Sequence, residues 1–215
     1  MPEPSWLRRG GQGRGPDGGS STWIAAEGAR GRRWREVRGT AGGTLGLLLE
    51  LEPSGRWSRL EMTAGSGLLT LHPNPPLDEL HGNVVTASGI RHLAFPWEPE
   101  HVVLAPGSVV CLAVLARALE GVVGVGERRR VRGVRIEPSL NVEPAMIDAA
   151  RLEPGTWRIG VVGAATEEVR LDAEGWPIVA GATSWPLEIE VGELPSVDAV
   201  WTTPSDRGGS RESRG

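Results

Sequence analysis

All four histidines of the chain fall in one stretch, between His72 and His101. Apolar runs separated by Gly, Pro, Asn and Ser fill this stretch, so we expect short antiparallel hairpins. One hairpin would pair His72 with His81, and the next would pair Asn83 with His92. Because side chains alternate along a strand, these pairings place one polar set on a common face. The expected polar face carries Thr70, His72, His81, Asn83 and His92.

Three interpretations of this face remain open. It is a solvent-exposed surface, a polar wall that binds a ligand, or a zinc site made by His72, His81 and His92. Imidazoles on neighbouring strands can bind zinc, but the sequence has no His-x-His or Cys-x-x-Cys spacing. We therefore expect no bound metal and no other cofactor. The opposite face is expected to enter the core and carries Leu69, Leu71, Val84, Leu93 and Phe95.

Signatures of catalysis are absent from the sequence. It contains no Gly-x-Ser-x-Gly, P-loop or dinucleotide-binding fingerprint. The single cysteine, Cys111, stands in an apolar run, which is typical of a buried and unreactive thiol. We expect no catalytic residues, and a small metal-dependent enzyme that uses the histidine face stays as an alternative.

One basic cluster occupies residues 127–133. In a strand, Arg128, Arg130 and Arg132 would point to one side, and Arg129 and Val131 to the other. The first three could bind phosphate, sulfate or an anionic lipid head group. A solvated strand that protects a sheet edge is the alternative interpretation.

Composition excludes several classes of protein. The net charge of −4 argues against a nucleic-acid-binding protein. No apolar run reaches the roughly 18 residues that a transmembrane helix needs. The first residues contain no apolar signal-peptide core, so we expect a cytoplasmic protein.

The rest of the chain predicts a single β-rich domain over residues 26–202. Arg/Gly-rich tails at 1–25 and 203–215 are expected to be disordered. Strand patterns bounded by Gly and Pro precede and follow one predicted helix, which begins after a Ser108 N-cap and ends at Gly121. This order predicts a mainly β fold, in which a large curved antiparallel sheet, a half-barrel or open barrel, surrounds one central helix.

The second half of the chain resembles a family of glycolipid-binding proteins. The resemblance rests on VRIEPSLNVEP (134–144), on RLEPGTWRI (151–159) and, more weakly, on EVRLDAEGWPIV (168–179), and it lies mainly in residues 134–187. It implies a curved antiparallel half-barrel, like that of lipoprotein-carrier proteins, around an apolar cavity that binds an amphipathic ligand.

The expected partner is therefore a glycolipid or a similar amphipathic or hydrophobic molecule, bound without catalysis. A structural or protein-interaction domain is a further alternative, and a homodimer stays open. Trp residues make up most of the large aromatics, since the chain has nine Trp, one Phe and no Tyr. The predicted ligand-binding residues are His72, His81, Asn83, His92, Trp57, Trp97, Trp157 and Trp176.

Overall fold

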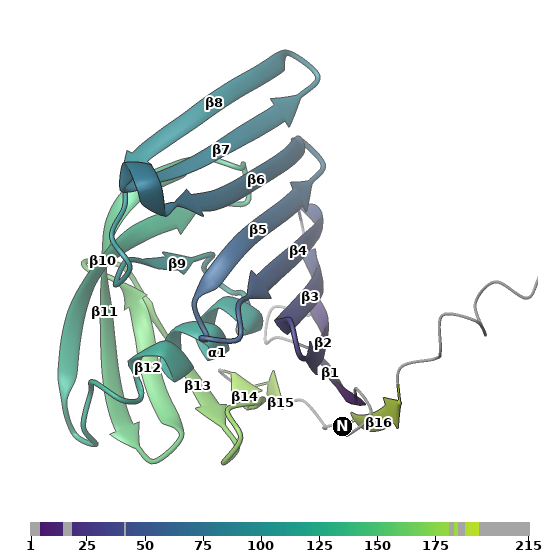
Figure 1. Cartoon of the computed structure of the whole chain (residues 1–215), viewed down its shortest axis with the longest axis vertical. Helices are drawn as coiled ribbons and strands as arrows, with labels where there is room; N and C mark the ends of the chain where they lie inside the picture. Colours follow the sequence, from purple (N-terminus) through teal and green to yellow (C-terminus); the bar gives the residue numbers. More distant parts are fainter. Residues whose placement is uncertain (1–4, 15–18, 41, 181–182, 185–187, 194–215) are drawn as a thin grey trace, which may run out of the picture.

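A computed structural model describes residues 5–14, 19–40, 42–180, 183–184 and 188–193. The described chain is mainly β and contains one α-helix, as the sequence predicts. Its strands form two sheets, one of nine strands and one of seven, rather than a single continuous one. Figure 1 shows the two sheets around the helix, with the seven-stranded sheet curled into a half-barrel.

The nine-stranded sheet has the order β16-β1-β2-β3-β4-β5-β6-β7-β8, and its pairings are all antiparallel. Its strands are β1 (Ser5–Arg14), β2 (Ser20–Gly28), β3 (Gly31–Thr40), β4 (Gly43–Leu51), β5 (Trp57–Ala64), β6 (Gly67–Asn74), β7 (Glu79–Thr86), β8 (Gly89–Pro96) and β16 (Glu188–Glu193). A short 3-10 helix, η1 (Pro75–Leu77), joins β6 to β7.

The seven-stranded sheet has the order β15-β14-β13-β12-β11-β10-β9. Its strands are β9 (Val102–Leu104), β10 (Arg128–Ile136), β11 (Val142–Glu153), β12 (Thr156–Val161), β13 (Thr166–Leu171), β14 (Pro177–Ala180) and β15 (Thr183–Ser184). One pairing, between β9 and β10, is parallel. That pairing is parallel because α1 (Val109–Leu119) lies in the connection between the two strands and reverses the chain.

The predicted helix is confirmed. Helix α1 begins at Val109, and the Ser108 hydroxyl accepts a hydrogen bond from the Cys111 N–H at 3.1 Å. It ends at Leu119, two residues before the predicted end. Most of its side chains are buried, and it contacts strands of both sheets. No helix among the described residues is long and apolar enough to cross a membrane.

The predicted disorder of residues 1–25 is wrong for the part that the structure describes. Strands β1 and β2 form there and extend the nine-stranded sheet. The high Gly and Arg content of β1 concealed the strand pattern of this segment. In β2, Trp23 and Ala25 alternate with exposed neighbours and enter the core. Residues 1–4, 15–18 and 203–215 lie outside the described residues.

The predicted pairing of the histidine strands is confirmed residue by residue. His72 pairs with His81, and Asn83 pairs with His92. Leu69, Leu71, Val84 and Leu93 are buried, and Phe95 packs against the core from a partly buried position. Short connections at both ends of β7 limit the possible registers. The apolar pattern selects one of them, because a slip by one residue would turn the apolar side chains to solvent.

Candidate functional site

The polar face of β6, β7 and β8 lies on the outside of the nine-stranded sheet. His72 and His92 are exposed, whereas Thr70, His81 and Asn83 are half-buried. His92 Nδ1 lies 2.6 Å from Asn83 Oδ1, and His81 Nε2 lies 2.5 Å from Glu79 Oε2. No group of three His, Cys, Asp or Glu residues within the described ranges could hold a metal ion.

A cavity of about 740 Å³ lies elsewhere, between α1 and the two sheets. Apolar residues of β4, of α1 and of β9 and β10 line its interior: Leu49, Leu51, Val102, Val103, Val114, Leu115, Leu119 and Val131. Polar residues of the β4–β5 turn, the η1 segment and the loop before β9 line it as well, among them Glu52, Arg56, Asp78, Glu79 and Glu100. The cavity therefore offers an apolar interior together with a charged wall.

Two of the predicted tryptophans, Trp57 and Trp97, line this cavity. Their ring centroids are 5.2 Å apart and their planes are nearly perpendicular, at 89°. Trp57 opens β5 opposite Leu51, at a bulge in the β4–β5 pairing. Trp97 follows β8, and its backbone N–H donates a hydrogen bond to the Asp78 carbonyl at 2.7 Å. These two indoles form an aromatic corner, defined here as Trp57 and Trp97.

His101 adjoins the aromatic corner and was not among the predicted ligand-binding residues. Its ring stands edge-on to Trp97, with centroids 5.2 Å apart. Nδ1 of His101 accepts the Glu98 N–H at 3.2 Å, so the neutral imidazole carries its proton on Nε2. Nε2 is buried and makes no hydrogen bond with any described residue. In the sequence, His101 is the last of the four histidines and lies beyond the strands of the predicted hairpins, which is the one feature that could have drawn attention to it.

Cys111 also borders the cavity, from the first turn of α1. Burial raises the pKa of this thiol to about 11. At neutral pH the thiol is therefore protonated, and a protonated thiol is a poor nucleophile. The cavity gains no activated nucleophile from Cys111.

The other two predicted tryptophans, Trp157 and Trp176, are fully buried in the core rather than in the cavity wall. Trp176 packs against Trp23 and Trp34 of the first strands, with centroid distances of 6.3 Å and 5.1 Å. Two guanidinium groups lie over its ring, Arg9 at 4.9 Å and Arg32 at 4.0 Å. We call this set, Arg9, Trp23, Arg32, Trp34 and Trp176, the seam, because it joins β1–β3 to the β13–β14 turn.

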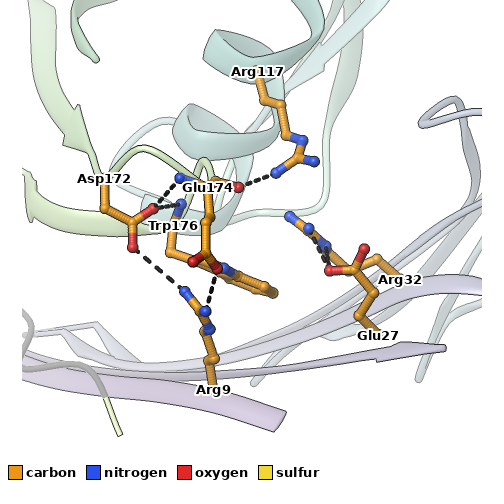
Figure 2. A network of polar contacts seen from close by, with 7 residues as sticks. All are labelled: Arg9, Glu27, Arg32, Arg117, Asp172, Glu174 and Trp176. Atoms are coloured by element: carbon orange, nitrogen blue, oxygen red, sulfur yellow. Dashed lines mark hydrogen bonds and ion pairs between the residues drawn. The ribbon is translucent and has the colours of Figure 1, made fainter. Parts of the chain in front are cut away.

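Figure 2 shows the polar contacts of the seam. Arg9 pairs with Asp172 at 3.5 Å and with Glu174. Arg32 pairs with Glu27 at 2.5 Å, and Arg117 of α1 donates to the Glu174 carbonyl. Burial lowers the pKa of Arg32, and the positive charge of Arg117 lowers it further. The carboxylates of Glu27, Asp172 and Glu174 each contact an arginine of the chain. Because Arg9 belongs to β1 and Asp172 and Glu174 belong to the β13–β14 turn, these contacts link the two sheets.

The predicted anion-binding arginines lie on the side of β10 that faces away from the cavity. Arg128 pairs with the buried Asp148 of β11, whereas Arg130 and Arg132 are exposed. Arg129 lines the cavity together with Val131, on the side that strand alternation assigned to these two residues. The structure thus separates the predicted basic cluster from the cavity and contributes Arg129 in its place.

The described residues form a mainly β fold, in which two sheets pack around one helix and a cavity lies beside that helix. Among solved structures, a crystal structure of a DUF1089 family protein from Pseudomonas aeruginosa is similar to this chain. The two share 17% sequence identity with a TM-score of 0.49, over 85% of this chain and 91% of that one. No protein-family model and no curated protein matches the sequence.

Proposed function

We propose that this chain binds an amphipathic molecule, a glycolipid or a similar ligand, without transforming it. The observation that carries the proposal is the cavity beside α1. Its volume of about 740 Å³ falls within the roughly 300–1,000 Å³ that is usual for small-molecule sites. Its apolar interior suits an acyl or alkyl chain, and its charged wall suits a polar head.

The aromatic corner supports the same proposal. Trp97 is 7% exposed and Trp57 is half-buried, so part of the indole surface can meet a ligand. An indole offers a broad apolar face and one N–H donor, a combination suited to the boundary between an alkyl chain and a sugar. Of the residues predicted to bind a ligand, Trp57 and Trp97 line the cavity, and the four polar residues on β6–β8 do not.

Intrinsic fluorescence tests the proposal, since nine Trp and no Tyr give a signal from one residue type. Dodecyl maltoside, an alkyl glycoside, is titrated below its critical micelle concentration. Filling of the cavity should shift the emission in a saturable way, and calorimetry should give a stoichiometry near one.

A variant that fills the cavity provides the specific control. Ala118 lines the cavity from α1 and is exposed to it, so Ala118→Phe should occupy the space without disturbing the core. We expect it to weaken binding at least about tenfold, which corresponds to about 1.4 kcal/mol. The matched change Ala94→Phe lies on the outer face of β8 and should leave binding unchanged. Equal affinity of both variants for the glycoside would refute the cavity as the binding site.

A further inference from the structure

The two walls of the cavity differ in charge. On the side of the nine-stranded sheet, four acidic residues line it, Glu52, Asp78, Glu79 and Glu100. The carboxylate of Glu79 contacts His81 of the outer face. On the side of α1 and β10, the charged lining residues are Arg117 and Arg129. Arg56 shares a turn with Glu52 and is the one cation among the described lining residues of the acidic wall. A charged ligand head would therefore be drawn to one wall according to its sign.

The acidic residues of this wall are neighbours of the aromatic corner in sequence or in strand register, and they line the same cavity. Glu52 follows Leu51, the partner of Trp57 in the sheet. The backbone carbonyl of Asp78 accepts a hydrogen bond from the backbone N–H of Trp97. Glu79 pairs with Pro96, the residue before Trp97. Glu100 follows Trp97 within the same loop. Each acid therefore lies beside one of the two indoles in sequence or in register.

Not all of these acids have partners. Glu79 contacts His81, and Glu52 accepts a hydrogen bond from Ser54 at 3.4 Å. The side chains of Asp78 and Glu100 form no ion pair or hydrogen bond with the residues that the structure describes. Two acidic residues that line the same cavity as the two indoles thus have side chains available to a ligand.

We propose that the head of the bound ligand carries an aliphatic ammonium group, which lies against Trp57 and Trp97 beside Asp78 and Glu100. The inference rests on the proposed function and narrows its ligand class. The face of an indole carries partial negative charge and attracts cations, most strongly where water is excluded. The rings of Trp57 and Trp97 are nearly perpendicular, so a group bound at the corner meets the face of one ring and the edge of the other. The carboxylates of Asp78 and Glu100 supply the negative charge that attracts the ammonium group. Arg117 and Arg129 repel such a cation from the far wall.

Amphiphiles that share one dodecyl chain and differ in the head test the inference. Dodecyltrimethylammonium and dodecylphosphocholine carry the ammonium group, dodecyl maltoside is uncharged, and dodecyl sulfate is anionic. All are titrated below their critical micelle concentrations and followed by Trp fluorescence and calorimetry. We expect the two ammonium compounds to bind about tenfold more tightly than the maltoside, and the sulfate to bind more weakly than the maltoside.

Substitutions of single charges make the test specific to the acidic wall. Glu100→Gln should bring the ratio of ammonium to maltoside affinity down to near one. Glu153→Gln removes an exposed carboxylate outside the cavity and should leave the preference intact. Asp78→Asn removes a second charge of the acidic wall, at the end of η1, and should also lower the preference for ammonium heads. The same result from both variants would show that the loss does not come from a local folding defect in one of them.

The outcomes separate this inference from the proposed function. Equal affinity for ammonium and maltoside heads would overturn the ammonium site but would leave an amphipathic ligand in the cavity. Failure of every dodecyl compound to bind would overturn both proposals. Choline chloride tests the source of the group: if choline alone binds as tightly as dodecylphosphocholine, the alkyl chain contributes nothing and a lipid source is overturned.

Discussion

Two tryptophan clusters in this molecule lie in different surroundings. At the seam, Trp23, Trp34 and Trp176 are each 1% exposed. At the aromatic corner, Trp57 and Trp97 border a cavity of about 740 Å³. Both clusters contain indoles about 5–6 Å apart, so ring spacing does not distinguish them. The difference lies in what covers the ring faces.

At the seam, the covering groups belong to the chain itself. Arg9 and Arg32 lie over Trp176, and both guanidinium groups are buried and paired with carboxylates. The guanidinium groups of Arg9 and Arg32 therefore already make cation–π contacts with the ring of Trp176. At the corner, acidic residues line the same cavity as the indoles, and none of the described arginines lies over either ring. The comparison shows that the chain itself covers the aromatic faces of the seam, and it supports our proposal that a ligand meets those of the corner.

The largest effect should come from Trp176. Trp176→Leu removes the ring against which two indoles and two guanidinium groups pack. The resulting void should lower the free energy of unfolding by at least about 2 kcal/mol. Urea denaturation with an unchanged m-value measures the loss. A loss below about 1 kcal/mol would show that the seam contributes little to stability.

A smaller loss is expected at Arg9, which links β1 to the β13–β14 turn. Arg9→Ala removes two ion pairs and one cation–π contact, and should cost about 1–3 kcal/mol. Asp172 would keep its bonds to the Glu174 and Trp176 N–H groups, so the turn itself should survive. Arg9→Lys should recover only part of the loss, because an ammonium group lacks the planar fork. Full recovery in the same urea experiment would show that charge alone matters.

Much of the fold could be predicted from the sequence, because local features determine it. The register of β6, β7 and β8 followed from short connections, and α1 followed from Ser108 and an apolar run. Strand β1 was missed because its Gly and Arg content resembles that of a disordered tail, and β2 was missed because it follows this Gly- and Arg-rich stretch. Strand β11, over Val142–Glu153, lacks a regular alternation of buried and exposed residues, so its pattern gave no clear strand signal.

The candidate site was much less predictable. Trp57, Trp97 and Cys111 come from three separate elements, and only the packing of α1 between two sheets brings them to one cavity. The sequence named Trp57 and Trp97 together with Trp157 and Trp176, since residue type cannot tell a cavity wall from a core position. The histidine pattern was more conspicuous, yet it marks an outer face. Periodicity reports which face is polar, and it carries no information on where a cavity forms.

Glu36 provides a third test, because this residue of β3 fixes the start of α1, which lies between the seam and the corner. The buried carboxylate accepts hydrogen bonds from Ser21, from Ser108 and from the Val109 N–H. Burial raises its pKa above the usual value of 4.5. The folded state therefore binds this proton more tightly than the unfolded state, so the contribution of Glu36 to stability falls as pH rises from about 4.5 through the folded pKa.

Glu36→Gln removes this pH dependence and keeps a hydrogen-bonding side chain of the same size. Its amide oxygen can accept from Ser21 and Val109, and its NH₂ can donate to the Ser108 hydroxyl. We expect its stability to stay within about 1 kcal/mol of the parent protein at neutral pH. The difference between the two proteins should shift in favour of the variant as pH rises, and thermal unfolding across a pH series measures it. A constant difference across the series would contradict the raised pKa.

The smallest effect on stability should come from Trp57, and it sharpens the comparison most. Trp57→Leu keeps an apolar side chain at a half-buried position, and should lower the free energy of unfolding by less than about 1 kcal/mol. The same change at Trp176 should be at least twice as costly, because Trp176 is covered on every side by its own chain. The order should reverse for ligand binding: Trp57→Leu should weaken dodecylphosphocholine binding several-fold, since one wall of the corner is lost. Folded Trp176→Leu protein, assayed at a temperature well below its unfolding transition, should keep the affinity of the parent. A large stability loss at Trp57, with unchanged binding, would place that residue with the seam and leave the cavity without an aromatic corner.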